Sequence, residues 1–162
     1  MGAVLQSGNV TPGHLVTWVT DGVVQDGGST PAAQRVLASL RGANFNITTD
    51  QPILIPLNFV AFQLTSIIVT NAPVSLTTAV GGFYPAANKG GTPIVAASQA
   101  YSTLTTSASL MTATLSSFGA NTRFSSANLG TINGFLAIWF ALTTLQGVNA
   151  TGDIYLCGID LS

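Results

Sequence analysis

The chain has 162 residues, of which 6% are charged and 47% are hydrophobic, and its formal net charge is −1. Soluble domains usually carry about a quarter charged residues. The few Lys and Arg residues form no cluster, so nothing supports binding to a nucleic-acid backbone. The length is enough for one domain with a core. Thr, Ser and Asn can hydrate a surface without charge, but so few charged residues favour a protein that assembles with neighbouring molecules.

The N-terminal region, residues 1 to about 28, is rich in glycine, contains short apolar pairs and shows no helical period. This pattern predicts an extended arm, in which two Asp-Gly pairs form turns. The stretch STPAAQRVLASLRG (residues 29–42) follows, with a capping Ser or Thr, a proline in the first turn and a glycine at the end. We therefore predict one short helix over residues 31–40, and an arm with this helix over residues 1–43.

Beyond residue 44, short β-like runs alternate with Gly, Pro, Asn and Ser. The clearest run is GFLAIWFALTTL (residues 134–145), which is apolar on both faces and therefore belongs in the centre of a sandwich or against a partner. The pattern predicts an all-β fold, an antiparallel β-sandwich over residues 44–162, with the jelly roll as the commonest arrangement of about eight strands. The predicted strands cover residues 44–48, 52–57, 60–70, 73–80, 93–104, 109–117, 134–145 and 152–161.

The stretch PILIPLNFVAFQLTSIIVT (residues 52–70) has no charge and is long enough to span a bilayer. It contains two prolines and many β-branched residues, which fit two short strands better than one membrane helix. We therefore predict no membrane association.

Few residues could act in catalysis or bind a metal ion. His14 is the only histidine, and the Ser and Asp residues near it lie in the same arm, without a scaffold that could fix a catalytic triad. One Cys and five dispersed Asp add too few ligands for zinc, although a calcium site built from backbone oxygens in DGVVQDGG is a less favoured alternative. Asp153 and Asp160 share neither a face nor an end of the last strand, so they form no glycosidase pair. We predict no enzyme activity, no catalytic residue, no metal site and no cofactor.

Two glycine pairs flank the run FYPAANK (residues 83–89). In a phosphate-binding loop the lysine follows a glycine and precedes Ser or Thr, whereas Lys89 precedes the second glycine pair. We therefore predict a long exposed loop, with Phe83 and Tyr84 at its tip as candidate contacts with a partner. Trp139 lies on the second face of its strand and is a candidate contact between copies of the chain. Together with the low charge of the chain, such a contact predicts a dimer or trimer.

Two stretches near the ends of the chain carry a resemblance to known proteins. In residues 8–31, GNVTPGHLVTWVTDGVVQDGGSTP, a Thr-Pro-Gly-His turn precedes Trp and then Asp-Gly-Val-x-x-Asp. This stretch resembles an N-terminal motif of small structural proteins of tailed bacteriophages. Residues 141–162, ALTTLQGVNATGDIYLCGIDLS, are similar to the closing strands of such proteins. Residues 45–130 contribute only a general β-rich character.

The resemblance implies a virion structural protein, above all a capsid decoration or cement protein, made in the host cytoplasm and placed on the capsid surface. The implied partners are the major capsid protein and copies of the chain itself. An arm that lies across a capsid subunit would add backbone hydrogen bonds and fill shallow pockets. Its expected contact residues are His14, Leu15, Val16, Trp18, Val23 and Val24. The alternative is a head-fibre or tail-associated receptor-binding protein.

Overall fold

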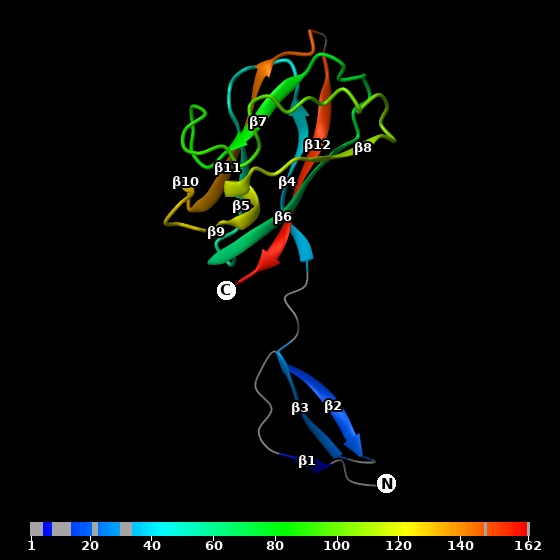
Figure 1. Cartoon of the computed structure of the whole chain (residues 1–162), viewed down its shortest axis with the longest axis vertical. Helices are drawn as coiled ribbons and strands as arrows, with labels where there is room; N and C mark the ends of the chain where they lie inside the picture. Colours follow the sequence, from blue (N-terminus) through cyan, green and yellow to red (C-terminus); the bar gives the residue numbers. More distant parts are fainter. Residues whose placement is uncertain (1–4, 8–13, 21–22, 30–33, 148, 162) are drawn as a thin grey trace. The chain divides into compact units, whose positions relative to one another are not determined.

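A computed structural model of the chain describes residues 5–7, 14–20, 23–29, 34–147 and 149–161 (Figure 1). Its internal contacts divide the chain into two compact units. These are the N-terminal unit, Met1–Ala33, and the sandwich, Gln34–Ser162.

The N-terminal unit is a sheet of three strands, β1 (Leu5–Ser7), β2 (His14–Thr20) and β3 (Val23–Ser29). The central strand β3 is antiparallel to β2 and parallel to β1. The predicted extended arm therefore contains strands that pair with one another. Of the two predicted Asp-Gly turns, Asp21-Gly22 lies outside the described residues and Asp26-Gly27 lies within β3.

The sandwich consists of two antiparallel sheets packed together, as the sequence predicts. The smaller sheet contains β5 (Gln51–Ile55), β7 (Val80–Tyr84), β10 (Gly130–Ile132) and β11 (Phe135–Thr144). Its central strand, β11, pairs with β5 along one edge and with β10 and β7 in succession along the other.

The larger sheet contains β4 (Gln34–Asn44), β6 (Ala61–Thr70), β8 (Leu110–Ala113), β9 (Arg123–Ser125) and β12 (Thr151–Asp160). Its order is β4-β12-β6, and both β8 and β9 pair with β6. The consecutive strands β4 to β7 alternate between the two sheets, which is a feature of jelly rolls. Beyond β7, however, Val95 makes only isolated bridges, so the assignment as a jelly roll stays a prediction.

The core lies between the sheets and is mainly aliphatic and aromatic. In β11 every second residue, from Leu136 to Leu142, is at most 1% exposed, which confirms that one face of this strand lies in the core. Four aromatic rings pack in its centre with centroids 5.1 to 5.9 Å apart and tilted or edge-on planes, an arrangement that favours aromatic pairs. They belong to Phe45, Phe83, Tyr101 and Phe140.

The predicted helix over residues 31–40 is wrong. Residues 34–44 form β4, at the end of the strand order of the larger sheet, and residues 30–33 lie outside the described residues. Ala, Leu and Arg favour a helix locally, but helix propensity is weak against the pairing of a whole strand. The pairing of β4 with β12 is also irregular at two places, so that Leu37 and Ala38 are both buried and the alternation typical of a strand is lost. The boundary between the units accordingly falls at Ala33, and not after residue 43.

Within the described residues the helix is α1 (Ser117–Asn121). Ser116 caps it, because its Oγ accepts a hydrogen bond from the Gly119 amide at 3.0 Å and donates one to the Pro93 carbonyl at 2.6 Å. Gly119 packs so closely on the backbone of Ile94 that a Cβ there would clash. The helix is therefore fastened to the segment that follows β7.

Five predicted strands are confirmed, namely those that correspond to β5, β6, β8, β11 and β12. The predictions over residues 44–48, 73–80 and 93–104 are wrong except at their ends and at isolated bridges. The apolar stretch over residues 52–70 forms two strands, as predicted. Within the described part of the chain, no helix has the length and apolar character needed to cross a membrane.

Candidate functional site

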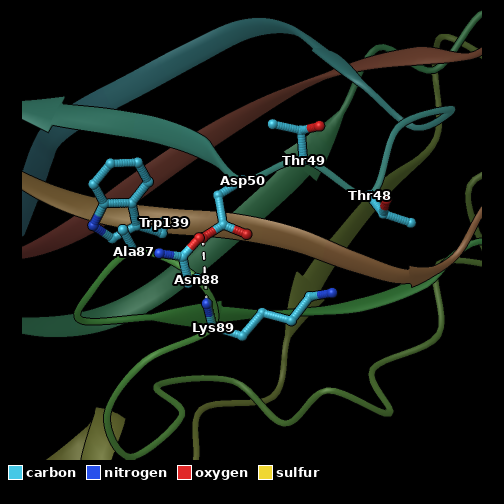
Figure 2. Close-up of a pocket in the computed structure, with 7 residues that line it drawn as sticks. All are labelled: Thr48, Thr49, Asp50, Ala87, Asn88, Lys89 and Trp139. Atoms are coloured by element: carbon cyan, nitrogen blue, oxygen red, sulfur yellow. Dashed lines mark hydrogen bonds between the residues drawn. The ribbon is translucent and has the colours of Figure 1, made fainter.

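A pocket of about 510 Å³ lies where the loop before β5 meets the loop after β7 (Figure 2). Its volume is within the range of small-molecule sites in proteins. Seven residues line it: Thr48, Thr49, Asp50, Ala87, Asn88, Lys89 and Trp139. The first three precede β5, the next three form the tip of the loop after β7, and the tryptophan comes from β11.

A tight turn forms one wall of the pocket. Asn88 and Lys89 have positive φ angles of 58° and 56°, and the Gly90 amide donates to the Ala87 carbonyl at 3.1 Å. Two consecutive positive φ angles with this hydrogen bond define a type I′ turn, for which glycine is the preferred second residue. A lysine in that position is strained by about 1 kcal/mol. The turn is tied to the loop before β5, because Asp50 Oδ2 accepts a hydrogen bond from the Lys89 amide at 3.3 Å (Figure 2).

Trp139 gives the pocket an apolar wall. It lies on the face of β11 that points away from the core and is partly exposed. Its Nε1 is buried and has no hydrogen-bond partner among the residues that the structure describes. The nitrogen lies beside Gly130, where an added Cβ would come within 3.7 Å of it. The indole therefore presents only ring carbons to the pocket.

The polar groups of the pocket balance in charge. Asp50 is partly buried, whereas Lys89 and Asn88 are exposed. In Figure 2 the lysine side chain runs away from Trp139, whereas Asp50 and Asn88 lie between them in this view. One carboxylate and one ammonium leave no net charge, so the site favours neither anions nor cations at long range.

Tyr84 lies on the same face of the smaller sheet as Trp139. It is opposite Trp139 in the pairing of β7 with β11 and is 4% exposed. Burial raises the pKa of its phenol, and the negative charge of Asp50 raises it further. The phenol therefore stays neutral at physiological pH and adds no charge to the pocket.

The prediction that Phe83 and Tyr84 occupy an exposed loop tip is wrong. Both side chains are buried, and both residues belong to β7. A Cβ on Gly81 or Gly82 would approach a backbone oxygen of a neighbouring segment to 2.5 Å. These glycines thus permit close contact between backbones in a strand, and the exposed tip of the loop comes later, at residues 87–89.

The predicted contact residues of the arm lie on two paired strands. His14, Leu15, Val16 and Trp18 belong to β2, and Val23 and Val24 belong to β3. The register places Trp18 opposite Val24. Their role as contacts with a capsid stays a prediction, as does the role of Trp139 between copies of the chain.

The acids considered for catalysis lie apart. Asp153 and Asp160 are near opposite ends of β12, where the first is 3.7 Å from Arg41 and the second forms an ion pair with Arg35. Asp153 is 7% exposed and also accepts a hydrogen bond from the Gly42 amide at 2.8 Å, which makes its role structural. In the described parts of the chain, no group of three or more His, Cys, Asp or Glu side chains could hold a metal ion.

Sequence reasoning missed most of the pocket. Thr48 was assigned to the end of a predicted strand, Thr49 and Asp50 fell between two predicted strands, and the turn at residues 87–89 was only part of a longer predicted loop. The dipeptide Asn88-Lys89 followed by two glycines was the available signal for a tight turn. No sequence signal places Trp139 beside it, because β11 is distant along the chain.

Comparison with known proteins gives no match: no family model, no curated protein and no solved structure is similar to the chain.

Proposed function

We propose that the chain is a non-enzymatic virion structural protein that binds the outside of a tailed-phage capsid and stabilises it. The observation that carries the proposal is the small size of the N-terminal unit, Met1–Ala33. Units shorter than about 40 residues rarely bury enough surface to be stable without a disulfide, a metal or a partner. The one cysteine, Cys157, belongs to the sandwich and so cannot form a disulfide within this unit. A partner surface is the support that fits it best.

The N-terminal unit offers two means of attachment. Its outer strands, β1 and β2, stand at the ends of the order β1-β3-β2, where the backbone of an edge strand is suited to pair with a strand of another protein. The strands also carry apolar residues, among them Leu15 and Trp18, that suit shallow pockets on a capsid subunit. A symmetric shell repeats such a contact many times, so weak individual contacts add up.

The sandwich contributes a second surface, the apolar end, which comprises Val36, Leu57, Val60 and Leu161. These side chains are 55%, 53%, 67% and 37% exposed. They lie at one end of the sandwich, because the start of β4 pairs with the end of β12 and the Leu161 amide donates to the Ala61 carbonyl at 2.9 Å (Figure 1). Exposed apolar side chains at one place are typical of contacts between proteins, here between copies of the chain.

The test compares the full chain with the fragment 34–162 and with Trp18→Ala for binding to purified expanded capsids. Co-sedimentation gives the number of copies bound and the affinity. We expect the fragment to stay folded by circular dichroism and to lose binding, and Trp18→Ala to weaken binding by about 2 kcal/mol. Leu110→Lys, which changes a residue 61% exposed on β8, is the control and should bind normally.

A fragment that decorates capsids as fully as the intact chain would show that the N-terminal unit is not the fastener. Binding of the full chain to tails but not to capsids would favour the receptor-binding alternative. Failure to bind either would reject a role in the virion.

A further inference from the structure

The pocket lined by Trp139 has the features of a site for a small ligand, independent of the capsid proposal. It combines an apolar wall with hydrogen-bonding groups on loops held by the sandwich. Small-molecule sites in proteins typically have an apolar lining with a small number of convergent polar groups. The strained lysine in the turn at residues 87–89 is a second, separate indication, because unfavourable backbone conformations concentrate at binding sites.

The lining selects the chemical class of the ligand. Trp139 presents ring carbons and no polar atom, so it suits a flat apolar face. Among the polar residues of the lining, Asp50 offers acceptors only, whereas the Asn88 amide offers both donors and an acceptor. A group that both donates and accepts, such as a hydroxyl, satisfies the two together. A ligand with an apolar face and several hydroxyls on its rim therefore fits the lining.

The balance of charge in the pocket disfavours two other classes of ligand, cations and anions. A cation would be attracted by Asp50 and by the indole face, but the ammonium of Lys89 opposes it. An anion would be repelled by the carboxylate of Asp50, and the one cationic side chain of the lining, Lys89, is exposed to solvent. A neutral ligand incurs neither repulsion.

From these observations we infer that the pocket binds a neutral sugar. One face of a pyranose ring, which carries C–H groups, lies on the carbon surface of Trp139. The hydroxyls on its rim bond with Asp50 and Asn88, and Thr48 and Thr49 border the remaining space. The pocket volume of about 510 Å³ accommodates one or two sugar rings. Because most of the lining is exposed, binding is weak, with a dissociation constant on the order of 1 mM.

The test titrates the full, isotope-labelled chain with D-glucose, D-galactose, D-mannose and N-acetyl-D-glucosamine, one at a time, and follows the backbone amide signals by NMR. Saturation-transfer measurements then show which sugar protons touch the protein. We expect at least one sugar to shift the amides of residues 48–50 and 87–89 in a saturable way. Saturation transfer should be strongest for the C–H protons of one ring face.

Variants assign the binding to the pocket. Trp139→Ala and Asp50→Asn should each weaken it about tenfold or more, and Trp139→Phe, which retains an aromatic face, should weaken it less. Phe135→Ala is the matched control, because Phe135 lies on the same outward face of β11, is 40% exposed and is not in the pocket. Its affinity should equal that of the parent. If Trp139→Ala fails to fold, Asp50→Asn and Trp139→Phe still decide the question.

Three results would overturn the inference. One is the absence of any shift in these amides with all four sugars at several tens of millimolar. Another is binding that Asp50→Asn and both Trp139 variants leave unchanged. The third is a response of the same amides to choline or to glycine at lower concentrations than to any sugar, which would assign the pocket to a cation or a zwitterion.

Discussion

Among the residues that the structure describes, Lys89 is the one whose backbone conformation least suits its side chain. It has a φ of 56° in a turn position that usually holds glycine. We predict that Lys89→Gly raises the free energy of unfolding by about 0.5–1 kcal/mol, because relief of the left-handed strain exceeds the added entropy of the unfolded chain. Urea denaturation measures the difference.

Asn133→Gly is the control for this substitution. Asn133 also has a positive φ, of 48°, in a tight turn with Gly134, but asparagine tolerates that conformation. Its stability should change little. A Lys89→Gly protein less stable than the parent would show that the lysine side chain contributes more than its strain costs.

Because of Tyr101, the stability of the folded chain is expected to fall at alkaline pH. It is fully buried, its hydroxyl donates to the Gly81 carbonyl at 3.3 Å, and burial strongly raises its pKa. Because the unfolded chain loses this proton near pH 10 and the folded chain retains it, the stabilising contribution is complete below pH 10 and falls above it. We predict that Tyr101→Phe reduces the alkaline loss of stability by about 1.4 kcal/mol per pH unit.

Urea denaturation of the parent and Tyr101→Phe between neutral pH and pH 11 or so measures this slope. The lost hydrogen bond lowers the stability of the variant by the same amount at every pH, so it does not affect the comparison. Parallel curves above pH 10 would contradict a buried, neutral Tyr101.

At the scale of elements, β7 depends on its glycines. A Cβ on Gly82 would lie 2.5 Å from the Val95 carbonyl oxygen and 2.9 Å from that of Ala96. We predict that Gly82→Ala lowers the free energy of unfolding by about 1–3 kcal/mol, because the backbone must move to admit the methyl group. Gly130→Ala in β10, whose Cβ would meet its nearest atom at 3.7 Å, should cost less than about 1 kcal/mol. Equal losses in thermal denaturation would contradict the close packing of β7.

The same elements show how far the sequence predicts the fold. β6, β11 and β12 were predictable because long apolar or alternating runs between turn residues are typical of strands. β7 was missed because its glycines look like loop residues, and only the folded structure shows that Gly81 packs on the backbone of β11 and Gly82 on that of residues 95–96. β4 was missed because irregular pairing with β12 removes its alternation. The pocket likewise depends on contacts between segments far apart in sequence, which local patterns do not contain.

At the scale of the whole molecule, the apolar end explains how so weakly charged a chain could associate with itself. We predict that the full chain is a dimer or trimer in solution and that Val60→Lys shifts it towards monomer, because the charge would be buried in the contact. Leu110→Lys is the control: its parent residue is similarly exposed but lies at the opposite end of β6. Analytical ultracentrifugation measures both. A monomeric parent, or equal effects of the two substitutions, would contradict this role for the apolar end.

We propose above that the chain is a structural component on the outside of a phage head. The most direct measurement is quantitative mass spectrometry of purified particles of the phage that this proposal requires to encode the chain, separated into heads and tails. We predict that the chain is found on heads, in a copy number comparable to that of the major capsid protein or a simple fraction of it, and that it is accessible to surface labelling. Its absence from particles, or a few copies confined to tails, would contradict the claim.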